Sequence, residues 1–527
     1  MKFILTFIGL LFLSNITYSK ESEILWSFDT NDMCYGQAAM ADLDGDGFYE
    51  IVFGCYRNDR MVYVLNAEDG SLFWKYDTEG TYGGCNDASP IIYDIDKDGA
   101  LEVIVASSCN NVTYCFEGAT GKIKWQTSTN GSDSPPTIID LDGDGNLEIL
   151  HGEFGGYVIC INGNDGIVKW EILVDENSWI QTAPTIVDLD DDGQLDFVVA
   201  TWHFYENNKL YAYNGKTREI LWSFDLNDVV YHGTTLVDIN NDGKQELIIG
   251  DYSGKLYALN ALDGAMIWSF QVPVRIYSPV LSGDLDGDGF CDIVFASNDR
   301  VVALNKDGTL IWEYILPGND FSFRGPALSD IDNDGLVDLV FGTYNGYLIA
   351  LKGTNGQPIW INNLAEYYGD IYRIDHAPVI GDFNKDGKLD CFIVGGYSVY
   401  PDFSNNRGRA YAIVAGTGQG PDWTMFQHDI RRTGSICETE VTSVDMLEQN
   451  DFLFSVYPNP TLGELFVGFS SINSCHLKIV NIFGNTVYEN DAFSTPVSID
   501  LCKQPAGMYI LKAYFDNITI TRKLIKF

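Results

Sequence analysis

The feature that most constrains this chain is a nine-residue acidic pattern, D-x-[DN]-x-D-G-x-x-[DE], that occurs eight times. The copies begin at Asp42, Asp94, Asp140, Asp188, Asp238, Asp284, Asp330 and Asp382. Successive copies start 46 to 52 residues apart, which is close to the length of one propeller blade. A chain with such a period is expected to fold as a series of similar units, each packed against its neighbours.

Short apolar segments flank each acidic copy. Ser89-Pro90-Ile91-Ile92 precedes the second copy and Val103-Ile104-Val105 follows it, and such short β-branched runs predict strands joined by an acidic turn. A third apolar segment, a turn and a fourth segment that contains a Trp complete most units. The Trp residues are Trp74, Trp125, Trp170, Trp222, Trp268, Trp312 and Trp360. A Gly lies four residues before each of them except Trp222, which Arg218 precedes at that distance.

Eight units of four strands predict an all-β fold, an eight-bladed β-propeller over residues 20–436. An open array of β-modules is the weaker alternative, because no linker separates the units. A seven-bladed ring with one atypical unit also remains open. Either the Trp26 segment or the Trp423 segment supplies the outermost strand of the last blade. The Trp26 segment is favoured because Pro421 and a polar run at 427–429 interrupt the later one.

The acidic loops predict a set of calcium sites. Acids at positions 1, 3, 5 and 9 converge if the chain turns sharply at the Gly in position 6, and a cage of hard oxygens in a flexible loop suits Ca²⁺ better than Mg²⁺ or Zn²⁺. Asp-rich turns that bind nothing are the alternative. It is disfavoured because eight sets of unneutralised carboxylates would repel one another. The loops are not EF-hands, since Phe53 occupies position 12 of the first copy and strands flank the loop.

Up to eight Ca²⁺ ions are therefore expected, with weaker binding where Asn240 and Asn384 replace an acid. The expected metal ligands are Asp42, Asp44, Asp46, Glu50, Asp94, Asp96, Asp98, Glu102, Asp140, Asp142, Asp144, Glu148, Asp188, Asp190, Asp192, Asp196, Asp238, Asn240, Asp242, Glu246, Asp284, Asp286, Asp288, Asp292, Asp330, Asp332, Asp334, Asp338, Asp382, Asn384, Asp386 and Asp390.

The repeats resemble two known families. The D-x-D-x-D-G loop with its following apolar run is similar to the FG-GAP/VCBS repeats, which also occur in integrin α-chain propellers. The segment Leu256-Tyr257-Ala258-Leu259-Asn260-Ala261, with Asp263-Gly264 and Trp268 after it, resembles the PQQ-like blade of quinoproteins. These resemblances cover residues 26 to about 434 and imply architecture more than activity. No PQQ cofactor is expected, because the adjacent cysteine pair of quinoprotein alcohol dehydrogenases is missing.

The C-terminal segment is expected to form a separate domain, with a linker at 437–450 and a small immunoglobulin-like β-sandwich at 451–527. It resembles the type A C-terminal sorting domain of the type IX secretion system of Bacteroidota. The matching blocks are Tyr457-Pro458-Asn459-Pro460, Gly463-Glu464-Leu465, 480–487, 505–511 and 522–526. The resemblance implies recognition by that secretion machinery and release or attachment at the cell surface. An accessory β-module without an export role is the alternative.

The N-terminus and the net charge agree with an exported protein. An apolar run at 3–12, with Thr17-Tyr18-Ser19 behind it, predicts a signal peptide over residues 1–19, and no later segment is apolar and long enough to predict a transmembrane span. The chain has a formal charge of −42 with 46% apolar residues. This composition excludes a basic nucleic-acid surface and an acidic disordered chain. A secreted or outer-surface location is therefore expected.

Eleven cysteines in an exported chain allow disulfides but cannot all pair. Lateral bridges between neighbouring blades, Cys115 with Cys160 or Cys55 with Cys109, are compatible with their equivalent positions in the repeat. Cys475 and Cys502 are a possible pair in the C-terminal domain. Burial as small apolar residues is the preferred interpretation for most of them.

The face opposite the acidic loops is expected to hold any ligand, because the irregular connections lie there. Aromatic, Arg and His side chains on that face suit a glycan or protein ligand. The candidate ligand-binding residues are Trp179, Trp202, His203, His232, Arg275, Arg324, Tyr372, His376 and Tyr400.

The sequence thus favours an exported, calcium-binding propeller that acts as a binding or adhesion module at the cell surface. The alternative is a secreted polysaccharide lyase. In that case His376, Tyr372 and Arg373 are the candidate catalytic groups for β-elimination from uronic acids. No nucleophile elbow or phosphate-binding loop supports another reaction.

Overall fold

The computed structural model describes residues 22–79, 84–190, 192–203, 207–318, 320–399, 402–418 and 420–437, and in the C-terminal segment 454–457, 464–469, 475–481, 486–492, 497–505, 507–515 and 518–526. The chain forms two compact units, Met1–Glu440 and Val441–Phe527. The predicted signal peptide and all but the first residue of the predicted linker lie outside the described residues.

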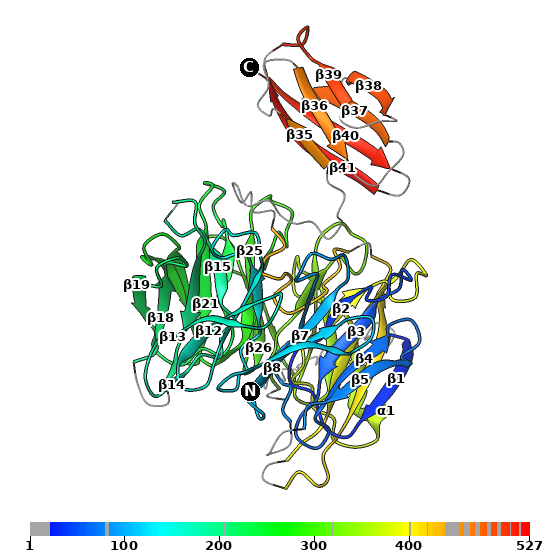
Figure 1. Ribbon diagram of the computed structural model, residues 1–527. Helices are drawn as coiled ribbons and strands as arrows, with labels where there is room; N and C mark the ends of the chain where they lie inside the picture. The colour runs from blue at the N-terminus through cyan, green and yellow to red at the C-terminus, as the bar shows by residue number, and fades with distance from the viewer. Residues whose placement is uncertain are drawn as a thin grey trace, which may run out of the picture. The chain divides into compact units, whose positions relative to one another are not determined.

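The described part of the first unit contains eight four-stranded antiparallel sheets, which confirms the predicted propeller (Figure 1). Blade 1 contains β2 (Ala39–Ala41), β3 (Glu50–Gly54), β4 (Met61–Asn66) and β5 (Leu72–Asp77), and blade 2 contains β6 (Ile91–Tyr93), β7 (Glu102–Ser107), β8 (Val112–Glu117) and β9 (Ile123–Ser128). Blade 3 contains β10 (Thr137–Ile139), β11 (Glu148–Gly152), β12 (Tyr157–Asn162) and β13 (Val168–Leu173). Blade 4 contains β15 (Thr185–Val187), β16 (Asp196–Ala200), β18 (Lys209–Tyr213) and β19 (Ile220–Asp225). A small extra sheet beside blade 4 pairs β14 (Ser178–Trp179) with β17 (Trp202–His203).

Blades 5 to 8 continue the same order. Blade 5 contains β20 (Thr235–Val237), β21 (Glu246–Gly250), β22 (Lys255–Asn260) and β23 (Met266–Gln271), and blade 6 contains β24 (Ile276–Gly283), β25 (Asp292–Ser297), β26 (Arg300–Leu304) and β27 (Leu310–Ile315). Blade 7 contains β28 (Ala327–Ser329), β29 (Asp338–Gly342), β30 (Tyr347–Leu351) and β31 (Pro358–Asn363). Blade 8 contains β32 (Val379–Gly381), β33 (Leu389–Tyr397), β34 (Arg407–Gly416) and β1 (Ile24–Thr30). A short helix, α1 (Leu364–Tyr368), follows blade 7.

The ring closes through the N-terminal strand. β1 pairs with β34, with Trp26 opposite Ala412 and Phe28 opposite Ala410, so the first strand of the chain is the outermost strand of the last blade (Figure 1). The favoured closure by the Trp26 segment is therefore confirmed. Closure of this kind couples the two ends of the propeller and removes an open sheet edge.

The repeated Trp and Gly lock each blade to the next one. The Trp26 indole Nε1 donates to Ala67 O of blade 1 at 2.8 Å, and Trp74 makes the equivalent bond to Gly118 O of blade 2 at 2.7 Å. The Gly four residues before the next Trp lies against this indole: a Cβ added at Gly70 would be 2.5 Å from the Trp26 ring. At the single exception in the repeat, the Arg218 guanidinium lies 5.8 Å from the centre of the Trp170 ring.

The core lies between the blades. The inner strands are buried throughout, as in β2 and β32, whereas the outer strands alternate between exposed and partly buried residues, as in β5. One apolar cluster joins Val198 of blade 4 to Leu247 and Ile249 of blade 5. Neighbouring blades therefore share their hydrophobic cores, which explains why a single blade cannot fold alone.

The segment 420–437 fills the channel at the centre of the ring. It exchanges backbone hydrogen bonds with inner strands of several blades, including Met40 N to Thr424 O at 2.9 Å, Ile138 N to Ile430 O at 3.0 Å and Leu236 N to Thr433 O at 2.8 Å. The Trp423 segment that competed for ring closure is therefore a plug that runs past the inner strands. We call residues 420–437 the plug segment.

Three disulfides occur among the described residues: Cys34–Cys55, Cys85–Cys109 and Cys291–Cys437. The possible lateral bridges were wrong. Cys115 and Cys160 are buried free thiols in separate blade cores, and Cys55 and Cys109 each pair within the loops around their own blade. The third bond joins the end of the plug segment to blade 6. The side chain of Cys475 lies outside the described residues.

The second unit is a β-sandwich, as predicted. One sheet contains β35 (Phe454–Tyr457), β36 (Glu464–Phe469) and β39 (Val497–Asp500), and the other contains β38 (Thr486–Ala492), β37 (Cys475–Asn481), β40 (Gly507–Phe515) and β41 (Ile518–Lys526). Leu465 and Ile499 of the first sheet pack with Leu477, Ile479 and Leu511 of the second.

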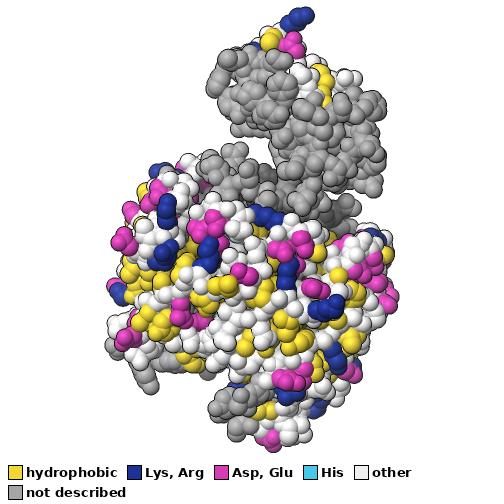
Figure 2. Space-filling model, in the orientation of Figure 1, with side chains coloured by type: hydrophobic (Ala, Val, Ile, Leu, Met, Phe, Trp, Pro, Cys, Tyr) yellow, Lys and Arg dark blue, Asp and Glu magenta, His cyan; other side chains and the backbone are white. Residues whose placement is uncertain are grey.

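The distribution of charged side chains on the propeller surface agrees with the net negative charge of the sequence. Figure 2 shows acidic and basic side chains interspersed over the visible face of the propeller, without an extended basic patch. No helix in the described part of the chain has the length and apolarity needed to cross a membrane.

Candidate functional site

The eight acidic loops share one hydrogen-bonding scheme. The carboxylate at position 1 accepts the N–H of the Gly at position 6 at 2.7–3.0 Å in every loop. The position 5 carboxylate accepts the N–H of position 7 at 2.7–3.1 Å. The Gly at position 6 has a φ of +82 to +92° throughout, a conformation that favours glycine. The backbone therefore folds each loop around its own carboxylates.

The acid at position 9 begins the second strand and is buried, with at most 3% of its surface exposed in each loop. One of its oxygens accepts the N–H of position 2 at 2.6–3.1 Å in all eight loops. Burial, together with the neighbouring carboxylates, raises the pKa of Glu50, Asp292 and Asp390 to about 7. Burial therefore favours the protonated form of these three groups, and a cation bound beside them would favour the ionised carboxylate.

The donor set of the loops fits a calcium ion. In at least five of the loops the carboxylates at positions 1, 3 and 9 have oxygens within 4.8 Å of one another. These groups are Asp42, Asp44 and Glu50; Asp94, Asp96 and Glu102; Asp140, Asp142 and Glu148; Asp188, Asp190 and Asp196; and Asp284, Asp286 and Asp292. Asp96 Oδ1, Asp140 Oδ1, Asp332 Oδ1 and Asp390 Oδ1, of loops 2, 3, 7 and 8, are buried without a hydrogen-bond partner. Several carboxylate oxygens that converge without a donor are ligands that a hard divalent cation would satisfy.

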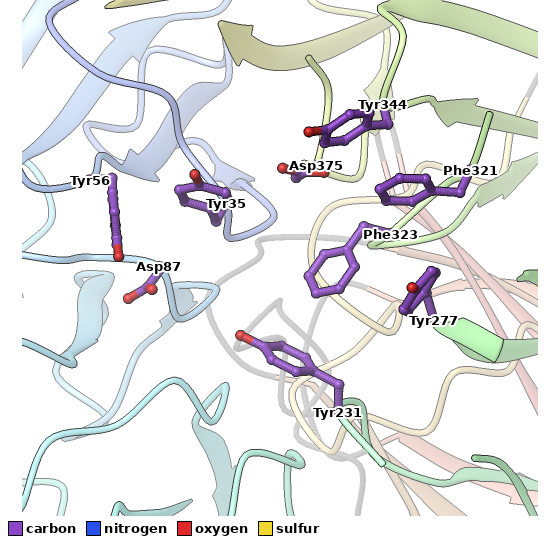
Figure 3. A pocket seen from close by; sticks show the side chains of 9 residues that line it. All are labelled: Tyr35, Tyr56, Asp87, Tyr231, Tyr277, Phe321, Phe323, Tyr344 and Asp375. Carbon is purple, nitrogen blue, oxygen red and sulfur yellow. The ribbon is translucent and has the colours of Figure 1, made fainter. Parts of the chain in front are cut away.

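A pocket lies on the opposite face, over the channel. It has a volume of about 450 Å³, and its lining comes from six blades: Tyr35, Tyr56, Asp87, Tyr231, Tyr277, Phe321, Phe323, Tyr344 and Asp375 (Figure 3). Most of these residues precede the first strand of a blade, whereas Tyr56 and Tyr344 follow a second strand. Both kinds of connection end on the face that the sequence assigned to a ligand.

Disulfides and ring contacts order the walls of this pocket. Cys34–Cys55 joins the chain beside Tyr35 to the chain beside Tyr56, and the two rings meet edge to face with centroids 4.9 Å apart. On the far wall Phe321 stacks on Tyr344 at 4.6 Å. Aromatic side chains held in this way lose little conformational freedom when a ligand binds.

The polar groups of the pocket are mainly acidic. Asp87 and Asp375 line it, and Asp133 lies behind Asp87. Burial and the adjacent Asp87 raise the pKa of Asp133 well above its usual range. Gln181 Nε2 donates to Asp133 Oδ2 at 3.1 Å. Burial raises the pKa of Asp375 to about 6.

Arg324 is a buried cation close to Asp133 and Asp375. It is 1% exposed, and its Nη2 donates to the Asp87 carbonyl at 3.1 Å. Its Nε and Nη1 are buried without a partner, and its guanidinium lies 5.1 Å from the centre of the Tyr231 ring. Arg373 and Arg324 both lie near Asp375, and Arg324 also lies near Asp133.

The plug segment closes the pocket below. His232 lies between Phe323 of the pocket wall, at 5.8 Å, and Phe426 of the plug segment, at 5.6 Å between ring centroids. Burial and the nearby Arg324 lower the pKa of His232 well below its usual range, so this ring is neutral. The plug segment thus closes the channel below the pocket.

The candidate ligand residues from the sequence are placed unevenly. The rings of Trp202 and the pocket residue Tyr231 have centroids 5.6 Å apart, and Arg275 lies over Tyr252. Arg373, which was predicted as a catalytic residue, lies 4.7 Å from the centre of the Tyr344 ring. Trp202 and Arg373 thus contact residues that line the pocket, and they do not line it themselves. Trp179 packs on Phe154 and pairs with Trp202 in the small β14–β17 sheet, where His203 pairs with Ser178. Neither Trp179 nor His203 lines the pocket. Tyr400 lies outside the described residues.

Two of the three predicted candidate catalytic residues, Tyr372 and His376, are buried, whereas Arg373 is partly exposed. Tyr372 is 1% exposed and its hydroxyl donates to Arg409 O at 2.7 Å. His376 is also 1% exposed, and burial with the nearby Arg324 lowers its pKa to about 3. Neither residue lines the pocket. Sequence reasoning missed Tyr35, Tyr56 and Asp375 because no repeated pattern marks them. The available signals were the cysteines directly before Tyr35 and Tyr56 and the position of Asp375 just before the first strand of blade 8.

Two parts of this chain, the propeller and the C-terminal unit, match known protein families. The family model described as outer membrane protein assembly factor BamB, built from PQQ-like repeats, matches residues 143–273 and 206–434. The chain belongs to this family of PQQ-like propellers. Within the PQQ-like propeller, an FG-GAP-like repeat model matches residues 94–151. A secretion system C-terminal sorting domain matches residues 455–527, which indicates secretion to the cell surface or beyond and recognition by the type IX machinery.

Solved structures confirm the fold of the PQQ-like propeller. A europium-containing methanol dehydrogenase is 12% identical, with a TM-score of 0.52 over 74% of this chain and 93% of the other. Quinohemoprotein alcohol dehydrogenase ADHIIG from Pseudomonas putida is 12% identical, with a TM-score of 0.51 over 76% and 77%. Saccharomyces cerevisiae Sqt1 is 12% identical, with a TM-score of 0.51 over 75% and 100%. No curated protein sequence matches the chain.

Proposed function

We propose that this exported propeller is a calcium-binding capture module whose pocket takes a positively charged group carried by a glycan or a protein. The observation that carries the proposal is the composition of the pocket: seven aromatic rings together with Asp87 and Asp375. Aromatic faces attract cations by about 0.5–2 kcal/mol each when water is excluded, and carboxylates add direct pairing.

The rings are suited to this task because their hydroxyls stay protonated. Burial raises the pKa of Tyr35, Tyr56 and Tyr231 above the usual value for a tyrosine, so the tyrosines add hydrogen-bonding groups without adding charge. Amino sugars and the side chains of Lys and Arg are the chemical groups that combine a positive charge with a surface for stacking. A polysaccharide lyase is less well supported, because the described pocket lining contains no His and His376 is buried.

The proposal is tested by binding to an array that carries the same glycans and peptides with free amines and with acetylated amines. Acetylation removes the charge and keeps the backbone of the ligand, so we expect retention of the free-amine members and a loss of at least about tenfold on acetylation. Asp375→Asn and Asp87→Asn should weaken this binding, whereas Asp263→Asn, an exposed change in a turn on the acidic-loop face, should not. Equal binding to both series would overturn the proposal.

A further inference from the structure

In two of the eight acidic loops, a lysine from the fourth strand of the same blade pairs with the buried acid at position 9. In loop 2 the Lys124 Nζ lies 2.5 Å from Asp96 Oδ2 and 2.8 Å from Glu102 Oε1. In loop 3 the Lys169 Nζ lies 2.7 Å from Asp142 Oδ2, 2.8 Å from Glu148 Oε1 and 3.6 Å from Asp144 Oδ2. Each ammonium group therefore contacts the carboxylates at positions 3 and 9, which are oxygens that a metal ion in the loop would need.

The position of these lysines in the repeat explains why only two loops are affected. Both residues immediately precede the Trp of the fourth strand, Trp125 in β9 and Trp170 in β13. The other blades carry an apolar residue there: Leu25, Phe73, Leu221, Ile267, Ile311 and Ile359. From this position only a long cationic side chain reaches the loop of the same blade.

Burial makes the two contacts different from ordinary surface ion pairs. The side chains of Lys124 and Lys169 are 20% and 21% exposed, and their partners Glu102 and Glu148 are 2% and 1% exposed. Pairs with this little solvent are screened weakly, and removal of one partner leaves an uncompensated buried charge. The lysines thus neutralise the buried acids of their loops in the way a cation would.

The lysines near loops 7 and 8 do not have this arrangement. Lys352 contacts Asp332 at 2.5 Å and Asp334 at 3.2 Å, but it comes from the turn after β30 and its side chain is 36% exposed. Lys388 contacts Asp386 alone and is 44% exposed. Neither has an ion pair with the buried acid at position 9 of its loop among the described residues.

We propose that Lys124 and Lys169 are built-in counter-ions that replace calcium in loops 2 and 3. A divalent cation and an ammonium group that share the same carboxylates would lie within a few ångströms and repel each other strongly. The tethered ammonium group is present at every calcium concentration. Blades 2 and 3 therefore form a metal-independent part of the ring, and calcium is confined to the other loops.

Calcium stoichiometry tests this assignment directly. Bound calcium is measured by elemental analysis after equilibrium dialysis of the whole secreted protein at saturating calcium. We expect Lys124→Met and Lys169→Met each to bind one more ion than the original protein, and the double variant to bind two more, because Met keeps the apolar stem and removes the charge. Lys75→Met, an exposed change directly after Trp74 of blade 1, should leave the number unchanged.

The reverse substitution keeps the test independent of whether the Met variants fold. Ile311→Lys places the ammonium group at the equivalent position of blade 6 and should lower the number of bound ions by one. Hydrogen exchange in a chelator gives a second readout: the strands of blades 2 and 3 should stay protected while β25 of blade 6 loses protection. An unchanged stoichiometry in Ile311→Lys, or equal loss of protection in blades 2, 3 and 6, would overturn the assignment.

Discussion

Asp375 of the pocket and the acids of the loops are carboxylates with different surroundings. The loop carboxylates converge with one another around a space for a cation, whereas Asp375 stands among aromatic rings with Arg324 and Arg373 nearby. Burial is the largest cause of its raised pKa, because removal of water penalises the charged form. A cation that enters the pocket restores the balance by favouring the ionised carboxylate.

Ligand binding should therefore depend on pH through Asp375. The unliganded carboxyl has a pKa of about 6, so it is ionised at pH 7.5 and becomes neutral as the pH falls below 6. We expect the affinity for an amine-bearing ligand to fall as the pH is lowered through this value, measured by calorimetry. Asp375→Asn should bind weakly and remove most of the pH dependence between 5 and 7.5. An affinity that rises on acidification would contradict this role.

The residues of the two sites differ in how far the sequence reveals them. The loop acids follow a strict spacing, and the shared hydrogen bonds at positions 1, 5 and 9 explain why that spacing is needed. The pocket residues come from connections of unequal length on six blades. Their convergence depends on the closed ring, which no local pattern encodes. Arg218 illustrates a third case: its departure from Gly was visible, but its place over Trp170 was not.

At the level of elements, the strands were predictable and the plug segment was not. Strand closure by β1 follows from the Trp26 segment, which matches the fourth strand of the other blades. Residues 420–437 have neither a period of two nor apolar continuity, and they form no strand of a sheet. Their hydrogen bonds go to inner strands that are far apart in the sequence, as in Ile380 N to Trp423 O at 2.9 Å. Such pairing is invisible before the ring is built.

Arg432 is the residue on which the plug segment depends most. It is fully buried, and its guanidinium donates to Pro136 O at 2.9 Å, to Phe426 O at 2.7 Å and to Pro90 O at 3.3 Å. Arg432→Ala leaves three buried carbonyl groups without donors and should destabilise the propeller by about 3 kcal/mol or more. Chemical denaturation at constant calcium measures this loss. The partly exposed neighbour Arg431→Ala should cost less than about 1 kcal/mol, and equal effects of the two changes would contradict the proposed role.

For the whole molecule, the acidic loops and the C-terminal export domain are both consistent with a protein that works outside the cell. The acidic loops concentrate carboxylates on one face of a ring that is closed by β1 and filled by the plug segment, and the C-terminal domain directs the protein to the cell surface or beyond. Calcium is plentiful outside the cell, so an exported protein would meet the ion that we propose for the acidic loops. Cys291–Cys437 fastens the end of the plug segment directly before the C-terminal unit, so the propeller remains filled if that unit is removed.

Thermal unfolding of the secreted protein with excess calcium and with a calcium chelator tests the central claim most directly. An ion that binds only the folded state stabilises it by roughly 2.7 kcal/mol per loop at a hundredfold excess over its dissociation constant. Several such loops should together raise the melting temperature by more than about 10 °C, and the chelator should abolish this gain. A melting temperature that is the same in calcium and in chelator would contradict the claim that calcium in the acidic loops holds the ring together.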